Sequence, residues 1–98
     1  MEIDLGDIVL SLSGRDKKRL FFVLKTQSGF AWLADGRMRK IENPKKKNLK
    51  HLKLVSKSES GVSQKIRNSE KVLNSEIRRT LAGFAQGDGE ADASDAGR

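Results

Sequence analysis

Three short apolar segments, separated by turn-forming residues, dominate the first third of the sequence. Ile8, Leu10 and Leu12 fall at every second position, a spacing that places their side chains on one face of a β-strand. The run 20–24 is rich in aromatic and branched residues and is too short for a helix, so it predicts a buried second strand. Residues 30–33 predict a third strand. The pattern therefore indicates a mainly β fold.

The connections between these segments contain glycine. Gly14 follows the first segment and is the residue there most able to take a positive φ. Residues 27–29 turn the chain again. Asp35-Gly36 favours a tight two-residue hairpin after the third segment, because both residue types tolerate positive φ. Together the segments and their turns predict a small antiparallel meander.

The pattern after residue 36 predicts the remaining strands of the sheet. We expect a strand at 37–41, with Met38 facing inward. Pro44 ends this strand because proline has no backbone N–H to donate. Residues 45–47 are three consecutive lysines and predict an exposed loop. The leucine spacing at 49–55 favours a single helical turn followed by a closing strand.

The C-terminal part of the chain is predicted to be helical and separate. The serine-rich stretch 56–63 reads as a linker, so residues 1–55 should form a domain that folds alone. Apolar positions at helical spacing predict a helical extension over 64–84, as one or two short helices, with Asn74 as an internal N-cap. The acidic tail 85–98 has no apolar anchors and is expected to be disordered.

Most of the positive charge lies in the first part of the chain. The 98 residues allow one domain and carry a formal net charge of +7. Residues 1–55 contain thirteen Lys or Arg and six Asp or Glu, whereas residues 87–98 contain one and four. A positive field of this kind favours polyanionic partners, either nucleic acid or an anionic membrane surface.

Enzymatic chemistry has no candidate residues in the sequence. The chain has no cysteine, which excludes a disulfide scaffold, a thiolate zinc site and a cysteine nucleophile. His51 is the only histidine, so an imidazole pair for a metal ion is excluded. No glycine-rich phosphate-binding run follows a predicted strand. We expect no enzyme activity, no cofactor and no small-molecule substrate. The absence of an export signal or a long apolar run predicts a cytoplasmic location.

The KOW motif of ribosomal proteins and transcription factors that touch RNA resembles residues 6–36, GDIVLSLSGRDKKRLFFVLKTQSGFAWLADG. Residues 35–54, DGRMRKIENPKKKNLKHLKL, resemble the segment after this motif in a group of small bacterial RNA-binding proteins. Those proteins are akin to KOW-containing large-subunit ribosomal proteins of archaea and eukaryotes. The resemblance implies a small SH3-like antiparallel barrel that binds RNA. Relatives often carry a second glycine late in the first turn, where this chain has Lys18.

Basic residues gather in the first turn and in the strip after residue 36. Glu42 is the one acid between Arg37 and Lys53. If the barrel closes as the resemblance implies, turn and strip could lie on one side and follow a phosphate backbone. The predicted RNA-binding residues are Gly14, Arg15, Lys17, Lys18, Arg19, Arg37, Arg39, Lys40, Lys45, Lys46, Lys47, Lys50, His51 and Lys53.

The aromatic residues have two interpretations. Trp32, Phe21, Phe22 and Phe30 could stack on unpaired bases, as aromatic side chains do in many RNA-binding sheets. A chain with five aromatic residues needs most of them for its core, so we favour core packing.

The predicted function is non-catalytic binding to structured RNA, ribosomal RNA or the ribosome in particular, by a protein that is monomeric when free. Two other classes stay open. A KOW-type protein-interaction module would use the helical stripe through Ile66, Leu73, Ile77 and Leu81 to dock a partner. Membrane association through the basic helices is disfavoured, because Phe84 is their one bulky interfacial aromatic.

Overall fold

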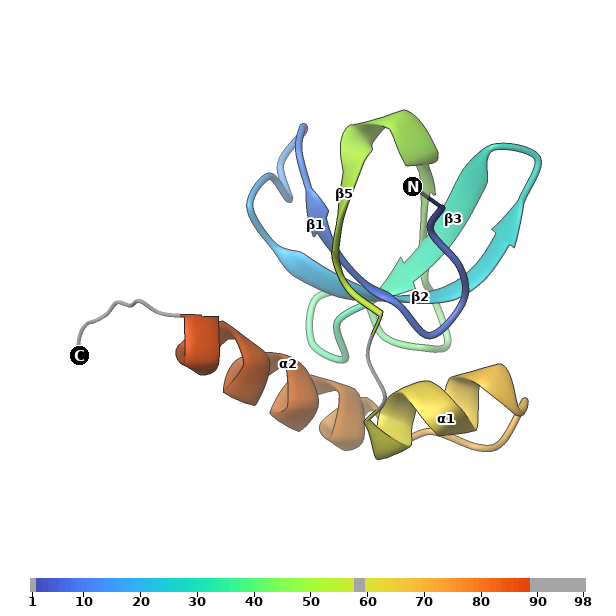
Figure 1. Cartoon of the computed structure of the whole chain (residues 1–98), viewed down its shortest axis with the longest axis vertical. Helices are drawn as coiled ribbons and strands as arrows, with labels where there is room; N and C mark the ends of the chain where they lie inside the picture. The colour runs from blue at the N-terminus through green and yellow to red at the C-terminus, as the bar shows by residue number, and fades with distance from the viewer. Residues whose placement is uncertain (1, 58–59, 89–98) are drawn as a thin grey trace.

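The computed structural model describes residues 2–57 and 60–88. Its elements are strands β1 (Ile8–Ser11), β2 (Leu20–Gln27), β3 (Phe30–Ala34), β4 (Lys45–Asn48) and β5 (Leu52–Ser56), the 3-10 helix η1 (Leu49–His51) and helices α1 (Gly61–Arg67) and α2 (Asn74–Asp88). The strands form one antiparallel sheet in the order β4-β3-β2-β1-β5, and both helices lie on one side of it (Figure 1). The predicted mainly β fold followed by C-terminal helices is confirmed, and the helices are two in number within the described residues.

The sheet is strongly curved, because strands that follow one another in the chain lie at its opposite edges. β4 and β5 are the edge strands, yet only the three residues of η1 separate them. In a flat five-stranded sheet the edges would lie about 19 Å apart, whereas three residues of 3-10 helix advance by about 6 Å. The sheet is nevertheless open, since β4 and β5 form no ladder within the described residues. The closed SH3-like barrel is therefore not confirmed.

Each face of the sheet carries its own buried apolar cluster. Val9 and Phe21 belong to the cluster on the face that the curvature encloses. Ile8 and Phe22 belong to a second cluster on the outer face, which α1 and α2 cover. This finding corrects the single apolar face predicted for the first strand. The neighbours Ile8 and Val9 are both buried, whereas Leu12 lies beyond β1 and is 44% exposed.

The tight hairpin turn lies between β2 and β3. Ser28 and Gly29 both have positive φ, 53° and 82°, as a two-residue type I′ turn requires. The hairpin predicted at Asp35-Gly36 is wrong, because β3 ends at Ala34 and the next strand begins only at Lys45.

A loop replaces the strand predicted at 37–41. Oδ1 of Asp35 accepts hydrogen bonds from the backbone N–H groups of Arg37 and Arg39, each at 2.9 Å. The carboxylate of Asp35 thus fixes the loop backbone at two positions, as Asp side chains commonly do in loops. The prediction of a strand here is wrong, and Met38 is 65% exposed instead of facing inward.

The lysine-rich run forms β4, not the predicted exposed loop. Its backbone pairs with β3 along its whole length. Because side chains alternate along a strand, Lys46 faces the outer side and Lys47 faces the enclosed side, where it is buried. The segment 49–55 follows its prediction, since η1 supplies one helical turn and β5 is the closing strand next to β1.

The C-terminal boundaries differ from the prediction. β5 includes Ser56 and α1 begins at Gly61, so the linker predicted at 56–63 is shorter at both ends. α2 continues to residue 88 and thus occupies the start of the tail predicted at 85–98. The remainder of that tail, 89–98, lies outside the described residues.

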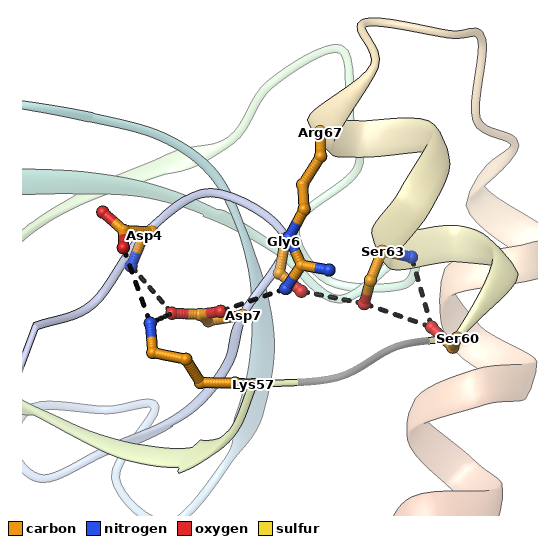
Figure 2. Close-up of polar contacts among 7 residues, drawn as sticks. All are labelled: Asp4, Gly6, Asp7, Lys57, Ser60, Ser63 and Arg67. Carbon is orange, nitrogen blue, oxygen red and sulfur yellow. Dashed lines mark hydrogen bonds and ion pairs between the residues drawn. The ribbon is translucent and has the colours of Figure 1, made fainter.

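A buried carboxylate next to β1 ties α1 to the sheet (Figure 2). Asp7 is 1% exposed, and its carboxylate oxygens lie 2.8 Å from Nζ of Lys57 and 3.3 Å from Nη2 of Arg67. Beside it, Oγ of Ser63 donates to the carbonyl of Gly6 at 2.8 Å. A Cβ at Gly6 would lie 2.9 Å from the Arg67 side chain, so glycine permits this close approach. The helices therefore belong to the same packed unit as the sheet.

We expect the outer apolar cluster to be required for folding. Ile77 on α2 is fully buried against the sheet, whereas Leu73, on the same predicted stripe, is 51% exposed. Ile77→Ala should lower the free energy of unfolding by about 2–4 kcal/mol, and Leu73→Ala by less than about 1 kcal/mol. Urea unfolding followed by circular dichroism measures both. Equal losses would contradict the packing described above.

Candidate nucleic-acid interface

The first turn, residues 12–19, holds its basic side chains on an unusual backbone. Gly14 has a φ of 81°, so its predicted positive φ is confirmed, and Lys18 has a φ of 72°. The backbone N–H of Lys18 donates to the carbonyl of Ser11 at 2.8 Å, which closes the turn against β1. A left-handed L-residue costs about 1–2 kcal/mol.

A buried ion pair anchors this turn to the far edge of the sheet. Nζ of Lys47 lies 2.6 Å from Oδ1 of Asp16 and 2.8 Å from Oγ of Ser11, and it donates to the carbonyl of Ser13 at 2.6 Å. The side chains of Lys47 and Asp16 are each 9% exposed. Lys45 adds a longer contact, 3.5 Å from Oδ2 of Asp16. Lys47 is therefore a structural residue, and the prediction that its side chain is exposed in a loop is wrong.

The ion pair sets the protonation of Asp16. Burial alone raises the pKa of this carboxyl group. Hydrogen bonds from Lys47 and Ser11, together with the charges of Lys47 and Lys45, outweigh burial and lower the pKa from 3.8 to about 2. Asp16 is therefore ionised at neutral pH, and its charge compensates that of Lys47 inside the fold.

A cationic groove of about 730 Å³ lies between the first turn and α2. The first turn contributes Lys18 and Arg19 to its lining, and the loop after β3 contributes Arg37. On the other side, α2 contributes Arg78 and Arg79. Leucine side chains, among them Leu10, Leu20 and Leu81, form its apolar lining. We call these five basic residues the groove cations.

Asp35 is the one acidic residue among the described residues that line the groove, and its side chain is already hydrogen-bonded. Its Oδ1 accepts the two backbone hydrogen bonds of the loop after β3, so its charge is directed into that loop. Nη1 of Arg78 donates to the carbonyl of Gly36 at 2.8 Å, and this bond fixes the loop against α2. A Cβ at Gly36 would clash with the backbone of α2, so glycine is required for this contact. The groove keeps a strong excess of positive charge.

The sequence prediction missed two of the groove cations. Arg78 directly follows the buried Ile77 and lies at the margin of the apolar stripe of α2, whereas Arg79 lies on the opposite side of the helix from Ile77, and both are exposed. The position of Arg78 could have been read from helical periodicity. What the sequence could not provide is the identity of the loop that these arginines meet, because the contact depends on how α2 lies across the sheet.

The structure divides the predicted RNA-binding residues into three groups. Lys18, Arg19 and Arg37 meet in the groove, and Gly14 shapes the turn beside them. Lys45 and Lys47 belong to the buried ion-pair network. The others lie on the surface and do not line the groove: Arg15, Lys17, Arg39, Lys40, Lys46, Lys50, His51 and Lys53.

Within residues 2–57 and 60–88, no group of three His, Cys, Asp or Glu side chains gathers as it would around a metal ion. In the same part of the chain, no helix has the length and apolar character needed to cross a membrane.

Two neighbouring lysines of β4 provide a matched test of the buried pair. Lys47→Met leaves the carboxylate of Asp16 buried without its main partner, so we expect a loss of about 3–5 kcal/mol in unfolding free energy. Lys46→Met removes an exposed charge and should cost less than about 1 kcal/mol. The double variant Asp16→Asn/Lys47→Met should recover part of the loss. Similar stabilities for the two single variants would contradict the structural role of Lys47.

The low pKa of Asp16 predicts a stability loss in acid. Because the folded pKa lies below the unfolded value of about 3.9, its stabilisation is fully present above pH 5 and is lost as the pH falls through 2. The shift from 3.8 to about 2 corresponds to about 2 kcal/mol. Unfolding free energies between pH 5 and pH 2 should fall by about that much more in the wild type than in Asp16→Asn/Lys47→Met. Parallel curves would show that Asp16 titrates normally.

Comparisons with known proteins add no family assignment to this geometry. No family model matches the chain, and no curated protein matches it.

Proposed function

We propose that this chain is a non-catalytic RNA-binding protein that docks on structured RNA, ribosomal RNA in particular, through the cationic groove. The single observation that carries the proposal is the convergence of the five groove cations from three separate segments around one hollow. We also propose that the curved five-stranded sheet is an open variant of the SH3-like fold of KOW proteins. The glycine-led turn between β1 and β2 supports that assignment.

Charge and shape both favour a phosphate backbone as the groove's ligand. Each phosphate neutralised by Lys or Arg releases condensed counterions, and this release supplies most of the affinity that does not depend on sequence. Four of the groove cations are arginines, whose planar guanidinium groups bind phosphate oxygens in pairs. A phosphate backbone that projects from an RNA fits into the hollow between the first turn and α2 better than it would fit against a flat surface.

The described residues that line the groove favour binding. They include the carboxylate of Asp35 but no histidine, and that carboxylate is hydrogen-bonded to its own loop. The remaining charged groups of this lining are cations, which suit an anionic ligand.

The alternative of a protein-docking helical stripe is not favoured. Ile66, Ile77 and Leu81 are buried against the outer face of the sheet, so they have no free surface to offer a partner. Of the four residues in that stripe, Leu73 is the exposed one.

The test compares two triple variants with the same change of charge. Lys18→Gln/Arg37→Gln/Arg79→Gln removes three groove cations, and Lys40→Gln/Lys50→Gln/Lys71→Gln removes three exposed lysines that do not line the groove. For a structured ribosomal RNA fragment, the groove variant should bind about 10- to 100-fold more weakly at ~0.1 M salt. Its log–log salt slope should become shallower by about 2–3.

The lysine control should change both quantities far less, and both proteins should melt like the wild type because these charges are exposed. Fluorescence anisotropy over a range of salt concentrations gives affinity and slope together. Equal effects of the two variants would show that the general positive field binds RNA and that the groove has no special role. No binding by the wild type would overturn the proposed function itself.

A further inference from the structure

Two aromatic side chains lie on the outer face of the sheet in two ordered rows. Across β2, β3 and β4, Trp32 lies between Lys25 and Lys46, and Phe30 lies between Gln27 and Asn48. Directly paired residues of neighbouring strands have Cβ atoms about 5 Å apart, so the members of each row touch. One ring is therefore flanked by two cations and the other by two amides. We call this surface the aromatic platform.

The platform rings are not part of either apolar cluster. Ala31 and Leu33, which alternate with them along β3, are fully buried on the enclosed face. Phe30 and Trp32 are only partly buried and belong to neither cluster, whereas Ala34 at the end of the same strand belongs to the outer one. Core packing, the interpretation favoured from the sequence, therefore applies to Phe21 and Phe22 but does not account for these two rings.

Lysine ammonium groups cover the ring faces. Nζ of Lys25 lies 4.7 Å from the centre of the Trp32 ring, and Nζ of Lys46 lies 4.5 Å from that of Phe30 and 5.6 Å from that of Trp32. Neither lysine has a carboxylate partner within the described residues. Such contacts at exposed sites are worth only about 0.5–1 kcal/mol. A ligand that offers both a stacking surface and a negative charge can displace them.

We propose that the aromatic platform binds unpaired bases of single-stranded RNA. This inference rests on the proposed function and gives the protein a second contact with RNA, distinct from the phosphate-binding groove. An RNA base stacks on an aromatic ring whatever its identity, and the adjacent phosphate attracts a cation. The pairing of Trp32 with Lys25 and Lys46 provides both partners in one row.

The second row adds hydrogen-bonding groups at the edge of the stack. Oδ1 of Asn48 accepts from the backbone N–H of Lys50 at 3.0 Å, so its NH₂ group is left to donate to a base. Gln27 is exposed at the other end of the row and carries both a donor and an acceptor. Phe30 therefore lies between two groups that can contact base edges, whereas Trp32 lies between two groups that can contact phosphates.

Trp32 is the single tryptophan of the chain, and its fluorescence reports directly on the platform. The wild-type protein is titrated with oligouridylate, with an abasic ribose-phosphate strand of the same length, and with duplex RNA. We expect oligouridylate to quench the fluorescence and the abasic strand to bind with little quenching, because only the first carries bases. Duplex RNA should bind through the groove and leave Trp32 unquenched. Quenching of equal size by the abasic strand would overturn the proposal.

A matched variant separates stacking from charge. Phe30→Leu removes a ring, retains Trp32 as the reporter and should weaken oligouridylate binding by about 5- to 100-fold while leaving duplex affinity unchanged. Lys71→Gln, at a residue that belongs to neither row, is the control for general charge. Unchanged oligouridylate affinity in Phe30→Leu overturns the platform.

The outcomes also separate this inference from the proposed function. Binding of structured RNA without any response of Trp32 to oligouridylate overturns the platform alone. Absence of binding to every RNA overturns both. The wild-type titration does not depend on the folding of any variant.

Discussion

The docking of the helical segment onto the outer face of the sheet is the constraint on which the rest of the structure depends. Asp7 is a carboxylate almost without exposure, so it must have cationic partners, and it finds them in Lys57 and Arg67. These partners fix the path of the chain after β5 and the position of α1. The apolar cluster of Ile8 and Phe22 with α1 and α2 completes the contact. Without this docking, α2 would not lie opposite the first turn and no groove would form.

The basic residues divide into those that hold the fold and those that face water. Lys47, Lys57 and Arg67 compensate buried carboxylates, and Lys65 on α1 pairs with Glu76 on α2 at 2.8 Å. The groove cations, in contrast, surround a hollow in which Asp35 is the one acidic residue of the described lining, and its carboxylate is hydrogen-bonded to its own loop. The net charge of the chain alone does not distinguish these groups. The positive field that matters for a polyanionic ligand is the part left after the structural pairs have been formed.

Local chemistry explains which parts of the fold could be predicted from the sequence. The first three strand segments, the turn at residues 27–29 and the positive φ of Gly14 all depend on residues close in the chain, and each of these predictions agrees with the structure. The three lysines at 45–47 were misassigned because their strand depends on pairing with β3 and on the distant Asp16. Asp35 was expected to make a hairpin and instead accepts two hydrogen bonds that bend a longer loop.

The candidate site depends even more than the fold on contacts between residues far apart in the chain, which the sequence could not predict. The basic first turn and Arg37 were predicted as RNA contacts, but the partners that complete the groove come from α2, more than thirty residues later in the chain. Long-range docking through Asp7 and the outer cluster cannot be read from periodicity. The aromatic residues of β3 were assigned to the core because composition could not show that both faces of the sheet already have apolar clusters.

The most direct test of the account is to map which backbone amides change when structured RNA binds. In an NMR titration of the ¹⁵N-labelled protein with a structured ribosomal RNA fragment, the account predicts simultaneous shifts in the first turn, in the loop at 35–39 and in the first two turns of α2. These three segments are far apart in sequence and meet at the groove. Shifts confined to residues 45–53, or spread evenly over the basic surface, would contradict the claim that the groove is the RNA-binding site.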